Sequence, residues 1–496
     1  MQDRCRRRCK MIANGLRRWA VLMLLCAALQ AHAGANFVIV AGQGFDDDTP
    51  ADPVAGNPGT TLGAQRQYVF QKATDQWGAV LNSIVPIRVE ASMEPDQCSG
   101  NSAVLGSGFP LSLYADFAPE ALADTWYVIA QANAMAFGDL DPTHNDITIS
   151  MNSDIDNGCL TGTTGWWYGV DAAVPVPGDK IPLLPLVVKR LAHGLGFISL
   201  TDPSSGEFCC DDNQRPDVWS WYMRDAATGK RWVEMDGSER FDSASNDPNL
   251  TWVGKNANRM QGAYLGAALL LTVNSPAAIA GSNPVAMPDF GPGLPKSGIT
   301  GSLVLVTDGD TSGGGTINDA CQPLTNAAQV TGKIALVERG ACQFVIKVKN
   351  AQNAGARAVI VQNNVDPDLP PLGGTDPTIT IATVGITQAL GTSLRANLAG
   401  GVNLTVGDPT KLAGTQGGFL RLNAPNPANF KLVNSMFTAD MFPNLLMQEN
   451  RYISRRMLTG FDITLDLLKD IGWSTNPDQI VHADGFDANP CPFVVP

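Results

Sequence analysis

The stretch from Lys333 to Asn364, KIALVERGACQFVIKVKNAQNAGARAVIVQNN, decides the fold of the second half of this chain. It opens with a short apolar run, residues 333–338, which is typical of a buried strand. Apolar residues then recur at helical spacing from Phe344 to Ala354, and Gly355 closes the pattern. A second apolar run follows at residues 356–362. The stretch therefore predicts a strand, a helix and a second strand in direct succession.

This block resembles the protease-associated (PA) domain family. The resemblance rests on GKIALVERGACQF at residues 332–344, on AGARAVIV at residues 354–361, and on VGIT at residues 384–387. It implies that residues 293–410 form a PA domain of mixed α/β type. PA domains are non-catalytic insertions that bind peptides, cover an active site or mediate contacts, so the resemblance implies no chemistry in this segment.

The segment before the PA domain, residues 34–292, is predicted to be the N-terminal part of a separate α/β unit. Strands are expected where β-branched residues cluster or alternate, and helices where apolar residues follow helical spacing. The expected strands cover residues 36–40, 84–91 and 146–152, and the expected helices cover residues 61–81 and 184–195.

The helix at residues 184–195 carries KRLAHGLGF, Lys189 to Phe197. This phrase resembles the zinc-peptidase motif His-Glu-x-x-His-x-x-Gly, in which two His bind zinc and the Glu is the general base. On this resemblance Lys189 stands at the first ligand, Arg190 at the base, and only His193 remains as a ligand. A protonated cation can neither donate a lone pair to zinc nor accept a proton from water. Read without the resemblance, LAHGLGF is a buried helix that ends at Gly.

Residues 411–474 extend the resemblance to secreted bacterial, PA-containing zinc peptidases of the leishmanolysin-like branch of the metzincins. In that family the third zinc His lies far downstream, eleven residues before the Met of a tight turn. Here Met447 matches the turn Met, and Met436 stands at the third ligand. The implied fold is α/β (α+β): a metzincin-like zincin domain, discontinuous in sequence, with an inserted PA domain. Residues 475–496 are predicted to be a flexible tail.

These substitutions predict that the zinc site is lost, so no catalytic residue, metal or cofactor is expected. Zinc is expected only if the chain uses ligands that the motif does not reveal, and neither His144 nor His482 is placed to complete a site. Lys189 and Arg190 are either solvated cations or replace the zinc charge by pairing with acidic groups. The acidic runs at residues 46–48 and 154–157 lack EF-hand spacing and are interpreted as solvated loops.

The N-terminus predicts export. Residues 1–33 combine a basic start, a short apolar run and an A-x-A site, which is the layout of a secretory signal peptide. No later segment is apolar and long enough to span a membrane. Residues 1–33 hold seven of the 34 Lys and Arg and one of the 47 Asp and Glu, so the formal net charge of the remainder is −19. This charge argues against nucleic acid and anionic membranes as partners.

Seven of the ten cysteines lie after residue 33, and export permits disulfides among them. Cys321 is expected to pair with Cys342 in one domain, and Cys98 with Cys159 in another. The remaining three, Cys209, Cys210 and Cys491, leave one thiol over.

Taken together, the sequence predicts a secreted pseudopeptidase that binds a polypeptide or regulates an active peptidase. Two alternatives stay open. The chain could be an active zinc metallopeptidase with unrecognised ligands, or an adhesive, structural exported protein that acts through its PA domain. Oligomeric state is not predicted.

Overall fold

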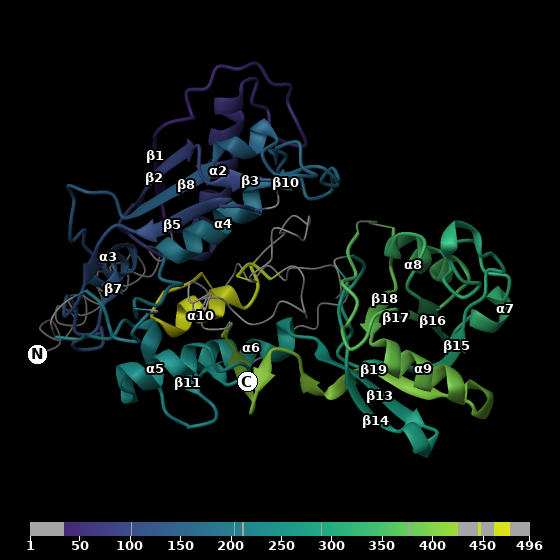
Figure 1. Ribbon diagram of the computed structural model, residues 1–496. Coiled ribbons are helices and arrows are strands. Elements are labelled where there is room, and N and C mark those ends of the chain that lie inside the picture. Colours follow the sequence, from purple (N-terminus) through teal and green to yellow (C-terminus); the bar gives the residue numbers. More distant parts are fainter. Residues whose placement is uncertain are drawn as a thin grey trace, which may run out of the picture.

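The computed structural model describes residues 34–424, apart from 101, 203, 211, 212, 289, 375 and 377, together with residues 445–447 and 461–476. Two units are visible in Figure 1, one built from both ends of this range and one from its middle. No helix within the described residues is both long and apolar enough to cross a membrane. The predicted signal peptide, Met436, His482 and Cys491 lie outside the described residues.

The first unit is built on a four-stranded sheet in the order β1-β2-β8-β5. Strands β1 (Phe37–Ala41), β2 (Ile87–Glu94) and β8 (Ile147–Asn152) are parallel, and β5 (Gly106–Pro110) runs antiparallel along the edge. In β2 the residues alternate between buried and exposed at its first four positions, as expected of a strand with one face against a core.

Two long helices pack against this sheet, α2 (Leu62–Val80) and α4 (Leu183–Gly194). Helix α2 begins where the hydroxyl of Thr61 accepts the N–H of Ala64 at 3.2 Å, which caps the helix. The indole N–H of Trp77 donates to the carbonyl of Val188 at 3.0 Å, so the two helices are joined by a buried hydrogen bond.

Shorter elements complete the first unit. They are β3 (Cys98–Ser99), β4 (Ser102–Ala103), β6 (Leu113–Tyr114), β7 (Tyr127–Val128), α3 (Ile129–Ala136), β9 (Trp166–Trp167), β10 (Ile181–Pro182), β11 (Met223–Asp225), α5 (Gly237–Ala244), β12 (Leu250–Trp252) and α6 (Lys255–Tyr264).

The second unit is a seven-stranded sheet in the order β14-β13-β19-β15-β16-β17-β18. Strands β15 to β18 pair in parallel, while β13, β14 and β19 are antiparallel. The strands are β13 (Ala267–Ser275), β14 (Gly281–Pro284), β15 (Ile299–Leu305), β16 (Ile334–Glu338), β17 (Ala358–Gln362), β18 (Ala382–Ile386) and β19 (Asn403–Leu412), and the helices are α7 (Ala327–Val330), α8 (Phe344–Asn353) and α9 (Gln388–Asn397). Strand β16, helix α8 and strand β17 form the predicted strand–helix–strand block.

The start of the second unit differs from the expected boundary at residue 293. Strands β13 and β14 belong to its sheet, so the unit begins near residue 267. The physical reason is that β13 pairs with β19, more than 120 residues further along the chain, and Leu271 and Val273 are buried in the core of the second unit. Local sequence patterns carry no information on such a long-range pair.

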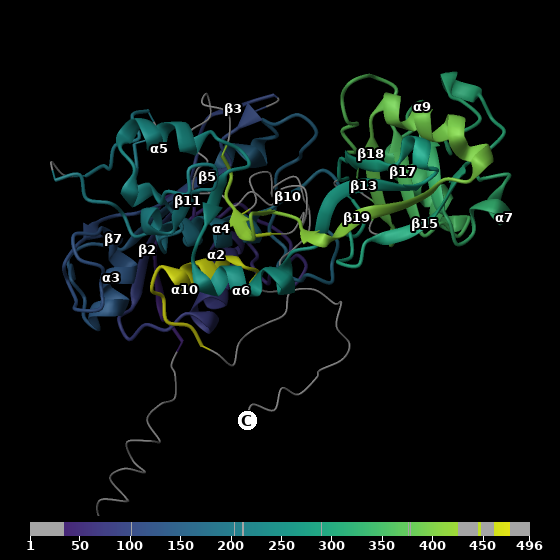
Figure 2. The ribbon, with the colours of Figure 1, turned by 90° about the horizontal axis from the view of Figure 1, so that it is seen from below.

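After the second unit the chain returns to the first. Strand β21 (Phe419–Arg421) pairs with β12 and with β20 (Thr415–Gln416), and helix α10 (Thr464–Asp470) lies beside α6 (Figures 1 and 2). The Asp470 carboxylate accepts the indole N–H of Trp252 and the backbone N–H groups of Asn256 and Ala257, at 2.9, 2.7 and 3.1 Å. The C-terminal segment therefore caps the start of α6 and completes the core of the first unit.

The first residues of the expected tail are ordered against α2. Thr475 forms a bridge with Leu81, and the N–H of Asn476 donates to the carbonyl of Val80 at 2.9 Å. The rest of the expected tail, residues 477–496, lies outside the described residues.

Candidate functional site

Helix α4 lies tightly against the sheet of the first unit. A Cβ on Gly194 would stand 2.4 Å from a side-chain carbon of Ile147 in β8, and one on Gly108 in β5 would stand 2.6 Å from the carbonyl of Arg190. The helix ends at Gly194, and Gly196 turns the chain away with φ +108°, a conformation that glycine tolerates best. Both glycines of the HGLG phrase are thus required by packing and by the turn.

The side chains of Lys189 and Arg190, the two cations of α4, are wholly or partly buried where the helix packs. Lys189 is 7% exposed, and the Nε of Arg190 is buried without a hydrogen-bond partner in the part of the chain that the structure describes. Loss of hydration lowers the pKa of Arg190 to about 10, so its guanidinium stays cationic at neutral pH. Of the two alternatives for these cations, pairing with an acidic group finds no ion pair of Arg190 among the described residues, and solvation does not fit its buried Nε.

The imidazole of His193 is buried in the core, and one of its ring nitrogens forms a hydrogen bond. Its Nδ1 lies 2.9 Å from the carbonyl of Phe197, and because a carbonyl only accepts, Nδ1 carries the proton. Burial lowers the pKa of His193 to about 3, with further contributions from the charges of Arg190 and Lys189. The ring is therefore neutral at physiological pH, with its Nε2 lone pair unprotonated.

The donors on α4 do not fit a zinc ion. A zinc site needs at least three protein ligands, and this helix offers one imidazole beside two cations. Within the described residues, no three His, Cys, Asp or Glu side chains are grouped closely enough to hold a metal. His144 is exposed and contacts Asp141 at 2.9 Å.

Met447 is completely buried in the core of the first unit. The N–H of the preceding residue, Leu446, donates to the carboxylate of Asp462 at 2.5 Å, and Asp462 also accepts the N–H and hydroxyl of Thr464. The turn that carries Met447 is thus fixed to the start of α10. Because Met436 lies outside the described residues, its relation to His193 stays a prediction.

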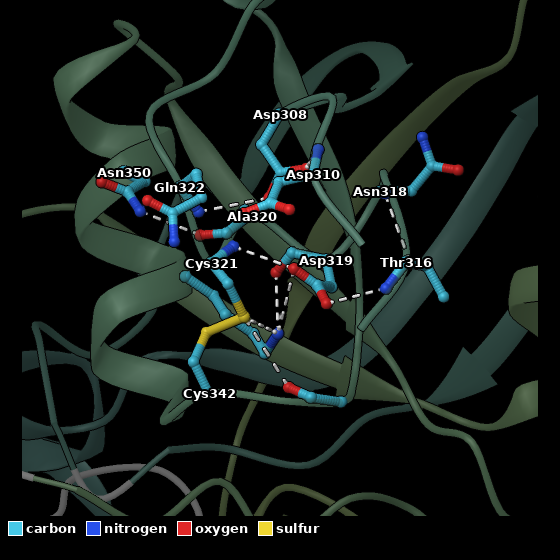
Figure 3. Close-up of a disulfide and its surroundings, with 12 residues drawn as sticks. Asp308, Asp310, Thr316, Asn318, Asp319, Ala320, Cys321, Gln322, Cys342 and Asn350 are labelled. Carbon is cyan, nitrogen blue, oxygen red and sulfur yellow. Dashed lines mark hydrogen bonds and ion pairs between the residues drawn. A yellow bond between two sulfur atoms is a disulfide. The ribbon is translucent and has the colours of Figure 1, made fainter. Parts of the chain in front are cut away.

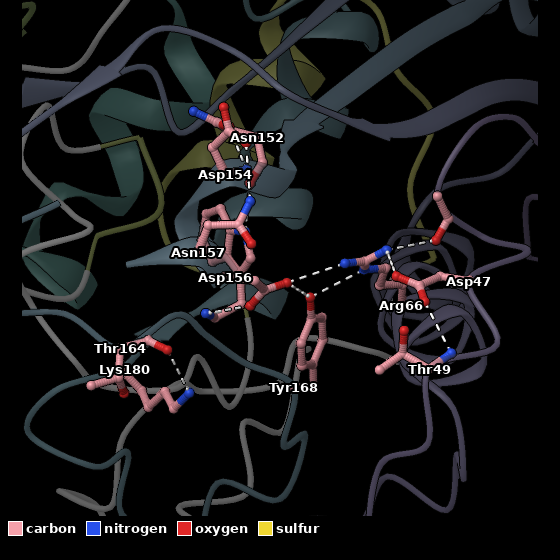
Figure 4. A network of polar contacts seen from close by, with 12 residues as sticks. Asp47, Thr49, Arg66, Asn152, Asp154, Asp156, Asn157, Thr164, Tyr168 and Lys180 are labelled. Carbon is pink, nitrogen blue, oxygen red and sulfur yellow. Dashed lines mark hydrogen bonds and ion pairs between the residues drawn. The ribbon is translucent and has the colours of Figure 1, made fainter. Parts of the chain in front are cut away.

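The two acidic runs are not simply solvated loops. Arg66 of α2 donates to the carboxylates of Asp47 at 2.9 Å and Asp156 at 3.2 Å, and Tyr168 donates to Asp156 at 2.5 Å (Figure 4). Burial lowers the pKa of Arg66, but its contacts with Tyr168 and Asp156 outweigh burial and leave that pKa raised. The Arg66 guanidinium therefore lies between the carboxylates of Asp47 and Asp156, which belong to the two acidic runs considered as calcium sites. No sequence signal joins Arg66 to a partner 90 residues away.

A pocket of about 730 Å³, which sequence reasoning did not identify, is lined mostly by the PA-like unit and by Gly178 of the first unit. Its lining comes mainly from the loop between β16 and α8, where the sequence reads RGACQF. The lining residues are Gly178, Arg339, Gly340, Ala341, Cys342, Gln343, Phe344, Asn364, Gly373 and Gly374. The GACQF phrase was notable only as a family resemblance, because nothing local indicates that the loop is hollowed.

The Arg339 side chain is held in place at this pocket. Its Nη1 donates to the side-chain oxygen of Asn363 at 2.9 Å, and its guanidinium carbon lies 5.9 Å from the centre of the Phe344 ring. Arg339 is thus a positioned cation beside an open space, with an aromatic ring as its neighbour.

Three disulfides are present in the described residues. Cys98 is bonded to Cys159 and Cys321 to Cys342, the pairs expected from the sequence, and Cys209 is bonded to Cys210. The remaining cysteine of the expected set, Cys491, lies outside the described residues.

Comparison with known proteins identifies the second unit. The family model of the PA domain matches residues 299–394, so this part of the chain is a PA domain. Its relatives include the probable lipoprotein aminopeptidase LpqL of Mycobacterium tuberculosis, 32% identical over 111 residues (22% of this chain, 20% of the relative). Vacuolar-sorting receptor 3 of Arabidopsis thaliana is 32% identical over 149 residues (27% and 23%).

Among solved structures, the aminopeptidase from Aneurinibacillus sp. strain AM-1 is 31% identical, with a TM-score of 0.21, over 30% of this chain and 32% of that protein. This chain spans only about a fifth to a third of the length of these relatives. The comparisons thus identify a PA domain within a mixed α/β protein.

Proposed function

We propose that this chain is a secreted, non-catalytic, peptidase-like protein whose PA domain binds an extended polypeptide. In this proposal the first unit is a metzincin-like domain that has lost its zinc ligands and base, and residues 1–33 direct export. The PA domain at residues 299–394 supports a protease-associated role in general.

The observation that carries the proposal is the chemistry of α4. Its three motif positions hold two cations and a neutral imidazole whose Nδ1 proton is used by Phe197. Neither Lys189 nor Arg190 can accept a proton from water near neutral pH, and general-base catalysis alone contributes ~10²–10⁴-fold to a rate. Hydrolysis by the mechanism of the intact motif is therefore not expected.

The PA pocket supports polypeptide binding. Its volume lies within the ~300–1,000 Å³ of typical ligand pockets. The polar side chains of Arg339, Gln343 and Asn364 line it together with glycines and a few apolar side chains. The Arg339 guanidinium can donate to peptide carbonyls or to an acidic side chain, and Phe344 offers an apolar surface. Glycines at residues 340, 373 and 374 let a peptide backbone approach closely.

The PA pocket, rather than α4, is the place to test binding. Because Lys189 is 7% exposed, reversing its charge would test folding more than recognition. Arg339 lines an open pocket, so its replacement tests recognition with little change to the core.

The experiment measures binding of fluorescently labelled β-casein, an unfolded polypeptide, to residues 34–496 by fluorescence anisotropy. Arg339→Gln should weaken binding about tenfold, as expected for a lost charge-assisted hydrogen bond. The matched control is Arg357→Gln, an exposed arginine of the same domain that does not line the pocket, and it should bind like the parent protein.

The same samples separate the alternatives. Chelator-sensitive cleavage of the casein would establish an active metallopeptidase with unrecognised ligands. If the parent protein and Arg339→Gln bind casein equally, the PA pocket is not the binding site. If neither protein binds casein, the adhesive alternative is favoured.

A further inference from the structure

The disulfide between Cys321 and Cys342 has two chemically different ends. The bond joins Cys321 to Cys342 (Figure 3). Cys342 is among the residues that line the pocket, whereas Cys321 is not. A molecule in the pocket therefore approaches this disulfide from the side of Cys342.

The sulfur of Cys321 contacts the ammonium group of a buried lysine, Lys347. Lys347 of α8 is completely buried, and its Nζ lies 3.2 Å from the Sγ of Cys321 and donates to the carbonyl of Asp319 at 2.8 Å. A cation at this distance stabilises a thiolate, and a disulfide sulfur with a lower thiol pKa is the better leaving group.

Two carboxylates oppose this effect, and both are held by backbone donors. Asp319 lies 3.8 Å from the Nζ of Lys347 and accepts the N–H groups of Cys321 and Thr316, at 2.9 and 3.0 Å. Asp308 accepts the N–H groups of Asp310 and Gln322, each at 3.2 Å. These bonds disperse the two negative charges, while Lys347 contacts the sulfur directly.

We propose that Cys342 is a site of thiol–disulfide exchange with small acidic thiols. The thiolate of the incoming molecule attacks the Sγ of Cys342 from the pocket and forms a new disulfide with it. The bond to Cys321 breaks, and its electron pair leaves on the Sγ of Cys321 as a thiolate beside Lys347. The incoming thiol releases its proton to solvent, and no net oxidation occurs.

The pocket favours thiols that also carry a carboxylate. Arg339 lines the same pocket as Cys342 and is the cation available to an anionic group there. The pocket volume of about 730 Å³ admits a tripeptide-sized thiol such as glutathione. This inference uses the pocket but not polypeptide binding, so it can fail or hold independently of the proposed function.

The test incubates folded residues 34–496 with glutathione at pH 8, blocks free thiols with iodoacetamide under acid quench, and maps tryptic peptides by mass spectrometry. Cys321 and Cys342 fall on different tryptic peptides because Lys333 and Arg339 lie between them. We expect glutathione on Cys342, carbamidomethyl on Cys321, and an intact bond between Cys98 and Cys159. Glutathione on Cys321, equal reaction of the Cys98–Cys159 and Cys321–Cys342 disulfides, or no exchange would overturn the inference.

Two variants separate the roles of the lysine and the pocket. Lys347→Met should slow the exchange about tenfold by raising the leaving-thiol pKa. If that variant does not fold, Cys321→Ser keeps the proposal testable, since its free Cys342 should react with oxidised glutathione faster than with the neutral disulfide of 2-mercaptoethanol. Equal rates with the two reagents would contradict recognition by Arg339.

Discussion

Arg190 in α4 and Arg339 beside the PA pocket are both arginines next to family-like motifs, but their surroundings differ. The Nε of Arg190 is buried without a described partner, and β5 crosses its backbone at Gly108. Arg339 is fixed by Asn363 and lines about 730 Å³ of open space. Arg190 thus lies in close packing at its backbone and Nε, whereas Arg339 is a fixed cation beside a pocket. This difference is the reason why we propose recognition in the PA domain rather than at α4.

The largest expected effect tests how closely α4 is packed. Gly194→Val should lower the free energy of unfolding by about 3 kcal/mol, because even a Cβ would overlap Ile147. The matched control is Gly262→Ala in α6, where a Cβ meets nothing within 4 Å, and it should leave stability unchanged or raise it by up to ~1 kcal/mol. Chemical denaturation measures both. Tolerance of Val at residue 194 would show that α4 has room above β8.

A smaller effect concerns the pH dependence of stability through His193. Its folded pKa of about 3 lies below the unfolded value, so below about pH 6.5 the unfolded state binds a proton that the folded state does not. Lowering the pH from 7 to 5 should therefore cost about 2 kcal/mol through this group.

His193→Gln should remove that part of the pH dependence, while His144→Gln, at an exposed His, should retain it. Urea denaturation of the three proteins at pH 7 and pH 5 measures the difference. An unchanged pH dependence of stability in His193→Gln would mean that the folded protein protonates His193 as readily as the unfolded protein does. The His193 imidazole would then be exposed to solvent rather than buried.

The smallest effect contrasts the two arginines directly. Arg190→Met should raise the free energy of unfolding by about 1 kcal/mol, because it removes a poorly hydrated charge and keeps most of the side-chain volume. Arg339→Met should change stability little and weaken casein binding instead. Thermal denaturation and anisotropy on both variants give the two readouts. Destabilisation by Arg190→Met would indicate that Arg190 has a stabilising partner. The two arginines would then differ less than we propose.

Local patterns predicted the main helices and several central strands of the two units, but not the shorter elements. The strand–helix–strand block of the PA domain and helices α2 and α4 follow from apolar spacing, with a terminating glycine after α8 and at the end of α4. The resemblance of α4 to a zinc-peptidase motif likewise rests on residue types alone, at residues 189, 190 and 193.

Features that depend on distant residues were not predictable. The pairing of β13 with β19, the bridge from Arg66 to Asp156, and the pocket at Arg339 each join segments that share no local pattern. The surroundings of Arg190 were also missed, because sequence gives residue types but not the carboxylates that lie within reach of them.

The most direct test of the central claim is the zinc content of folded residues 34–496 after equilibration with trace zinc and dialysis, measured by elemental analysis. A loss of the ligand set on α4 predicts zinc well below one ion per chain in a folded protein. About one zinc per chain would contradict the account, and would restore the peptidase interpretation with ligands that the motif does not reveal.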